Sequence, residues 1–146
     1  MNRINMAVDK FHDEYACSQA ILTEYGALYG MEQDTALKLA SGFAGGMRMG
    51  KTCGAVTGAY MVLGLAFGGH NCSKMDGRQR VYAATSEFTE NFIETHGTVK
   101  CSDLLGCDIS TPEGIQAVHE QNLIQTVCPK FVKTAAELLE RLIEKR

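Results

Sequence analysis

The sequence predicts an all-α fold, a single-domain bundle of five to six helices around a buried glycine-rich central helix. Apolar residues recur at helical spacing through most of the chain, and no run alternates well enough to indicate a strand. The 146 residues include 45% apolar and 21% charged residues, which is ordinary for a globular protein with one core. Residues 1–146 are therefore expected to form one helical domain.

Two helices are expected in the first third of the chain. The first covers about residues 4–28, on a stripe made by Ile4, Val8, Phe11, Tyr15 and Leu22. Cys17 shares this face and should point inward. The second helix is expected to open near Asp34, a good N-cap, to carry Phe43 on its apolar face and to stop at the glycine pair 45–46.

A third helix is expected over residues 52–67, with Thr52 as its N-cap, and forms the glycine-rich centre of the bundle. The stretch 53–73 has no acidic or basic residue when His70 is counted as neutral, and it is just long enough to span a bilayer. Five glycines and several polar residues dilute its hydrophobicity, so we expect a buried helix and no membrane insertion. Its Gly54-x-x-x-Gly58 spacing would let a neighbouring helix approach closely.

The remaining helices are marked by their caps. One helix carries an apolar face from Val81 to Phe92 and stops at Gly97. Residues 101–106 suit a short helical turn, and Thr111-Pro112 is a helix-start signal for a segment carrying Ile115, Val118 and Ile124. The last helix is expected to begin at Pro129.

Composition excludes some classes of function. The net charge of −3 and the absence of a basic cluster argue against a nucleic-acid partner. The first fifteen residues lack the apolar core of a secretion signal, so a cytoplasmic protein with reduced thiols is expected. Six cysteines without any C-x-x-C spacing exclude zinc-ribbon and thioredoxin signatures.

One motif suggests a nucleotide site. Gly45-x4-Gly50-Lys51-Thr52 matches the phosphate-loop pattern. That pattern needs a buried strand before it, whereas residues 36–43 look helical. A glycine turn with Arg48 and Lys51 in solvent is the favoured interpretation.

The cysteines give a stronger signal. Cys53 lies at an expected helix start, where the positive end of the helix dipole would lower the pKa of its thiol. Cys128 precedes Pro129 at the start of the last helix, and Cys101 opens the short turn. Each could instead be a small buried hydrophobe. Cys72 is interpreted as an incidental thiol, and Cys107 is ambiguous.

The pattern of cysteines resembles the C_GCAxxG_C_C family of redox-active proteins, small and mostly bacterial domains of about this length. The resemblance rests on Cys17 in Tyr15–Ala20, on Cys53 in Cys53–Gly58, on Cys101 in Cys101–Gly106, and on Cys128. The central motif reads CGAxxG here, not the GCAxxG of the family label. Cys107 could take the place of Cys101. The resemblance implies a redox or metal role and no defined reaction.

Three hypotheses follow for the function. In the first, Cys17, Cys53, Cys101 and Cys128 converge and bind an iron–sulfur cluster or another soft metal for electron transfer. In the second, Cys53 is the redox thiolate of a metal-free dithiol and one of the other three resolves. In the third, the chain is a non-catalytic helical binding or assembly module. An oxidoreductase and an electron carrier both remain open, as do the redox partner protein and a homo-oligomer.

Overall fold

The computed structural model describes residues 2–145, and within this range the chain folds into nine α-helices and no strand. The all-α expectation is confirmed. The helices are α1 (Arg3–His12), α2 (Cys17–Gly26), α3 (Gln33–Ala40), α4 (Gly54–Phe67), α5 (Met75–His96), α6 (Cys101–Leu105), α7 (Pro112–Glu120), α8 (Leu123–Thr126) and α9 (Cys128–Glu144).

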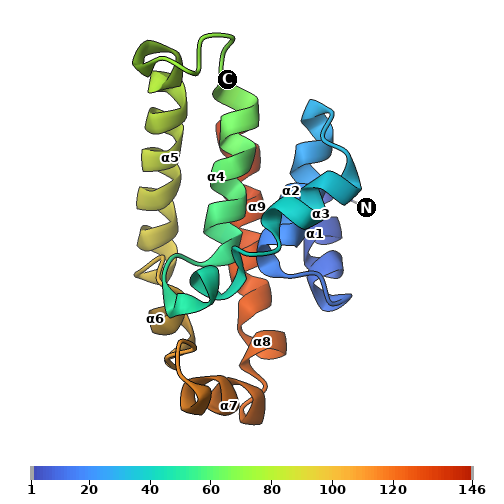
Figure 1. The fold of residues 1–146 in the computed structure, drawn as a ribbon, viewed down its shortest axis with the longest axis vertical. Helices are drawn as coiled ribbons and strands as arrows, with labels where there is room; N and C mark the ends of the chain where they lie inside the picture. Colours follow the sequence, from blue (N-terminus) through green and yellow to red (C-terminus); the bar gives the residue numbers. More distant parts are fainter. Residues whose placement is uncertain (1, 146) are drawn as a thin grey trace.

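Three long helices set the shape of the molecule. Helices α4, α5 and α9 run along its long axis, while α1, α2 and α3 lie to one side of them (Figure 1). The short helices α6, α7 and α8 gather at the lower end in this view. The loop between α4 and α5 lies at the opposite end.

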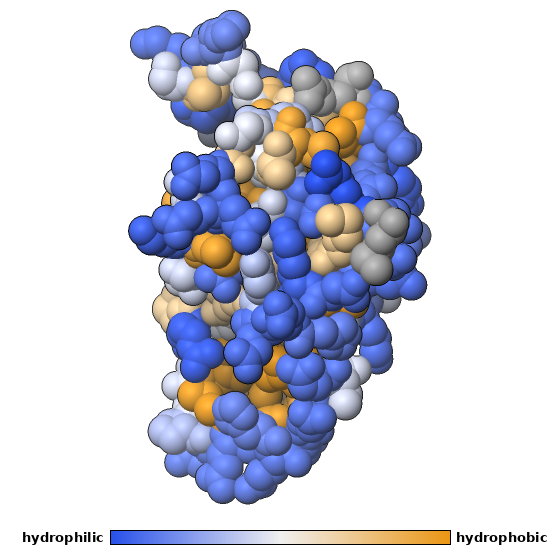
Figure 2. Space-filling view, turned by 90° about the vertical axis from the view of Figure 1, so that its right-hand side faces the viewer, coloured by the Kyte–Doolittle hydropathy of each residue, from blue (hydrophilic) through white to orange (hydrophobic). Residues whose placement is uncertain are grey.

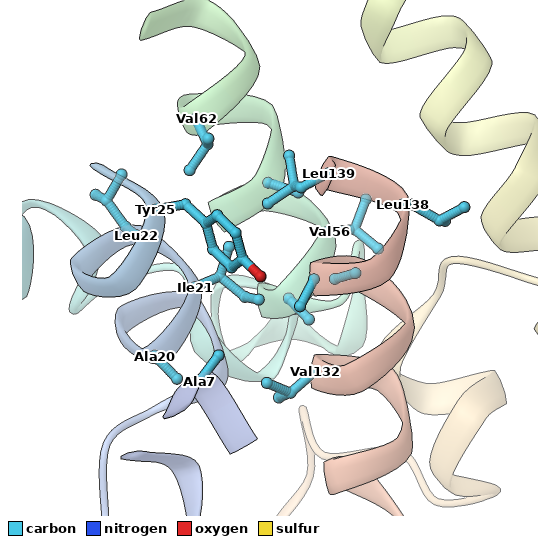
Figure 3. Packing of buried hydrophobic residues seen from close by; sticks show 14 of the residues in the cluster. Ala7, Ala20, Ile21, Leu22, Tyr25, Val56, Val62, Val132, Leu138 and Leu139 are labelled. Atoms are coloured by element: carbon cyan, nitrogen blue, oxygen red, sulfur yellow. The ribbon is translucent and has the colours of Figure 1, made fainter. Parts of the chain in front are cut away.

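The main core forms where α2, α4 and α9 meet. The ring of Tyr25 on α2 points between α4 and α9, toward Leu139 and Val132 (Figure 3). Its hydroxyl donates to Oε2 of Glu140 at 2.7 Å, so the buried phenol keeps a polar partner. Helix α4 is buried along much of its length, as expected for the central helix. None of the helices in residues 2–145 is both long and apolar enough to cross a bilayer.

The expected single helix over residues 4–28 is wrong, because the chain breaks between His12 and Cys17. Glu14 adopts a left-handed conformation with φ 72°. The N–H of Ala16 then donates to the side chain of Gln19, which caps α2. The break lets α1 and α2 fold back on each other, so that buried Glu24 pairs with Arg3 at 2.6 Å and Lys10 at 3.4 Å.

Smaller differences concern the helix ends. Helix α3 stops at Ala40 and leaves Phe43 outside, and Cys53 rather than Thr52 is the N-cap of α4. Ile124 does not belong to α7, because Asn122 turns left-handed at φ 53° and starts the separate helix α8. These breaks raise the number of helices above the expected five to six.

Candidate functional site

Two of the cysteines are aligned by a short backbone pairing. Thr52 and Lys100 form an isolated antiparallel bridge. Next to it, the N–H of Cys53 donates to the carbonyl of Val99 at 2.7 Å, and that of Cys101 donates to Lys51 at 2.6 Å. The bridge ties the start of α4 to the start of α6. Cys53 and Cys101 are thereby held on adjacent backbone segments, although 48 positions separate them in the sequence (101 − 53).

Cys17 reaches the same place from α2. The break before α2 makes it the first residue of that helix. Its sulfur packs against Gly54, the first residue of α4, where an added Cβ would stand only 2.4 Å from Sγ. One turn later, a Cβ at Gly58 would lie 2.9 Å from the carbonyl oxygen of Ser18. Both glycines of the CGAxxG motif therefore serve the close contact between α2 and α4 within this chain.

The glycine-rich loop before Cys53 adds a backbone donor. Gly45, Gly46, Met47 and Arg48 are all left-handed, with φ between 59° and 65°. This turn brings the N–H of Gly45 to the sulfur of Cys17. Residues 2–145 contain no strand ahead of the loop, so the phosphate-loop match lacks the element that it needs.

Four cysteines line one cavity of about 260 Å³ at the lower end of the bundle: Cys17, Cys53, Cys101 and Cys128. Cys128 enters from the first turn of α9 and Cys101 from that of α6. The walls are mainly apolar and include Phe11, Leu105, Ile109, Ile115, Val118 and Phe131. Tertiary structure thus brings together the four cysteines that the sequence singled out.

The other two cysteines lie outside this cavity. Cys107 packs against a small cluster that contains Cys101 and Ile109, but it does not line the cavity. Cys72 is exposed in the loop between α4 and α5, at the opposite end of the long helices (Figure 1). Of the two alternatives, Cys101 is therefore the residue that shares the cavity with Cys17.

The charge of the cavity centres on a hydrogen-bonded pair. The thiol of Cys53 donates to the sulfur of Cys17 and, against the effect of burial, lowers the pKa of Cys17 to about 7. The N–H groups of Gly45, Ser18 and Cys17 itself reinforce this shift. The same contact, together with burial, raises the pKa of Cys53 well above its ordinary value. The two thiols therefore titrate as a pair, in which the pKa of Cys17 is lowered and that of Cys53 is raised.

The other two thiols stay protonated near neutral pH. Burial raises the pKa of Cys101 to about 11, and the charge on Cys17 adds to this while Arg48 opposes it. Burial raises the pKa of Cys128 to about 12, with added effects from Cys17 and Cys101. Cys17 thus has the lowest pKa of the four thiols in the cavity.

Sequence reasoning missed four polar residues of the cavity: Glu14, Arg48, His119 and Gln125. Arg48 is exposed, as expected, and its side chain also lines the cavity. Arg48 belongs to the glycine-rich segment that leads into Cys53, and this closeness in sequence was the available signal. Glu14, in the break after α1, and His119, on α7, line the cavity only because the fold places both segments beside it.

The four sulfurs do not form a metal-ligand shell as they are placed. Among residues 2–145, no three histidine, cysteine or acidic side chains come close enough together to hold one ion. All six cysteines are free thiols. The donor set suits a soft metal, but its arrangement does not, so a cluster bound to these residues stays a prediction.

Comparison with known proteins gives one match. A family model described as "Putative redox-active protein (C_GCAxxG_C_C)" matches residues 15–142, a range that contains all six cysteines. Neither the curated proteins nor the solved structures yielded a match.

Proposed function

Because this chain belongs to the C_GCAxxG_C_C family, whose description is redox-active, we propose that it performs thiol–disulfide chemistry at Cys17 and Cys53. Cys17 is the attacking thiolate and Cys53 the second thiol. One observation carries the proposal: the two thiols are hydrogen bonded, and this contact lowers the pKa of Cys17 to about 7. A thiol whose pKa lies near the ambient pH combines a large thiolate fraction with good nucleophilicity.

The reaction balances with a disulfide as the oxidant. The thiolate of Cys17 attacks one sulfur of the substrate disulfide, forms a mixed disulfide and releases the other half as a thiolate. Cys53 then attacks the sulfur of Cys17 and gives up its proton to the second leaving thiolate. The product is a Cys17–Cys53 disulfide, and two electrons have passed to the substrate. A small thiol or a dithiol protein restores the pair by the reverse exchange.

The surroundings of the pair support this division of roles. Backbone N–H groups of the left-handed turn and of α2 stabilise charge on Cys17. Cys53 instead holds the proton of the pair, which it must lose only in the second step. The neutral thiols of Cys101 and Cys128 leave Cys17 as the single nucleophile of the cavity near neutral pH.

A second candidate function is electron transfer through a thiolate-bound cluster. The observation that favours it is the convergence of Cys17, Cys53, Cys101 and Cys128 on one cavity. Such a group would supply one-electron chemistry. Binding would require the sulfurs to move into a ligand geometry and three further thiols to lose their protons.

Two measurements separate these candidates. The reduced protein is treated with one equivalent of a small disulfide and analysed by peptide mapping. The wild type should then contain a Cys17–Cys53 disulfide. Cys53→Ser lacks the second thiol and should retain the mixed disulfide on Cys17. The control is Cys72→Ser, which should react as the wild type does. A disulfide that leaves out Cys17 would contradict the proposal. Brown protein with iron and acid-labile sulfide after anaerobic purification would favour the cluster.

A further inference from the structure

The side chain of Arg48 folds back against the glycine-rich turn that borders the cavity. Its Nη1 and Cδ lie 3.5 Å and 3.7 Å from the place where a Cβ of Gly45 would be. The N–H of that glycine donates to the sulfur of Cys17. Although Arg48 is an exposed residue, its side chain therefore covers the loop that holds the reactive sulfur and lines the cavity in front of it.

The guanidinium has no acidic partner in the part of the chain that the structure describes. None of the four ion pairs between residues 2 and 145 includes Arg48. The positive charge of Arg48 acts on the cavity, because it lowers the pKa of Cys101 against the effect of burial. No carboxylate is among the main causes of the pKa shifts of the four cysteines, although Glu14 also lines the cavity. A fixed positive charge thus faces the site, and its donors are free for an anion.

The cavity itself suits a small ligand with an apolar body. Its volume of about 260 Å³ lies just below the range of roughly 300–1,000 Å³ that is common for drug-sized ligands. Leu105, Ile109, Ile115 and Val118 supply apolar walls. Seen from the side, hydrophobic residues gather in a hollow near the lower end of the molecule, bordered by hydrophilic ones (Figure 2).

We infer that the cavity binds one half of a small organic disulfide, whose apolar body contacts these walls and whose carboxylate pairs with Arg48. This inference rests on the proposed function. A guanidinium binds a carboxylate through two parallel hydrogen bonds, which would orient the disulfide toward the sulfur of Cys17. Cys17 then attacks the nearer sulfur, keeps the carboxylate-bearing half as a mixed disulfide and releases the other half as a thiolate. Arg48 thus determines specificity and takes no part in bond making.

Two chromogenic disulfides test the inference: dianionic 5,5′-dithiobis(2-nitrobenzoate) and neutral 4,4′-dithiodipyridine. Stopped-flow rates with reduced protein are divided by the rates of a free small thiol with the same reagents. Loss of a charge-assisted pair in Arg48→Gln should lower the rate with the dianionic reagent about tenfold. The rate with the neutral reagent should stay within about twofold. Glu14→Gln removes a negative charge that lines the cavity. It should raise the reaction rate with the dianionic reagent and leave the rate with the neutral reagent unchanged.

Lys51→Gln is the matched control. Lys51 is an exposed cation three positions away that does not line the cavity, so its loss should change both rates by less than about twofold. If Arg48→Gln slows both reagents equally, or slows neither, the inference about the substrate is overturned and the proposed function stands. If Cys17 in the wild type reacts with neither reagent, the proposed function itself fails.

Discussion

The sulfur of Cys17 lies directly against the backbone of Gly54. A Cβ at this glycine would stand 2.4 Å from Sγ and 3.0 Å from the Cα of Ala44. The missing side chain therefore makes room for the thiol beside the start of α4, where it meets its partner Cys53. This contact gives a physical reason for a glycine directly after the cysteine of the motif.

Gly54→Ala should destabilise the fold and separate the thiol pair. The added methyl group overpacks a site bounded by backbone, so a loss of about 1–3 kcal/mol in the free energy of unfolding is expected. Gly64→Ala is the control within the same helix. Nothing lies within 4 Å of its Cβ position, and a gain of about 0.5–1 kcal/mol is expected there. Equal stabilities of the two variants in urea unfolding would contradict the packing argument.

Cys53→Ala should raise the pKa of Cys17 above about 7. The thiol of Cys53 is the largest cause of the low value, and burial would then act with less opposition. The pH dependence of alkylation at Cys17, followed by mass spectrometry, measures the shift. Cys72→Ala, at a remote exposed position, should leave the midpoint unchanged. An unaltered midpoint in Cys53→Ala would remove the basis for treating the two residues as a pair.

The thiols should react in a defined order as the pH rises. Only a thiolate is alkylated, so the labelling of Cys17 by iodoacetamide should rise through pH of about 7. Cys101 and Cys128, with pKa values of about 11 and about 12, should remain protonated at pH 8 and react at least roughly tenfold more slowly. Faster labelling of either residue than of Cys17 at pH 8 would reverse the assignment of the nucleophile.

Glu14→Gly should be tolerated or stabilising, because Glu14 is left-handed in the break before α2. Relief of about 1–2 kcal/mol of backbone strain exceeds the entropic penalty of glycine. Met6→Gly, at an exposed position inside α1, should instead cost about 1 kcal/mol, because Met is a good helix former. Thermal unfolding of both variants checks this. A loss at Glu14 as large as that at Met6 would indicate that the chain does not break there in solution.

Local signals predicted the helices whose ends depend on single residues. Gly97 ends α5 in a left-handed conformation, and Thr111 caps α7 with its side chain, as their residue types indicated. The break before Cys17 had no comparable signal, because the apolar stripe continues through it. The break is instead accompanied by the pairing of Glu24 with Arg3 and Lys10, which forms only when α1 and α2 lie side by side.

The sequence by itself determined that the fold is helical, that α4 is its buried centre, and that Cys17, Cys53, Cys101 and Cys128 are the cysteines to examine. Tertiary structure alone decided which thiol has the lower pKa. Helix position favoured Cys53, whereas the assembled site directs the thiol of Cys53 and three backbone N–H groups to Cys17. The reason is that a thiol pKa depends on burial and on donors within a few ångströms. Here those donors come from α2, from the turn at Gly45 and from the start of α4, which meet only in the folded chain.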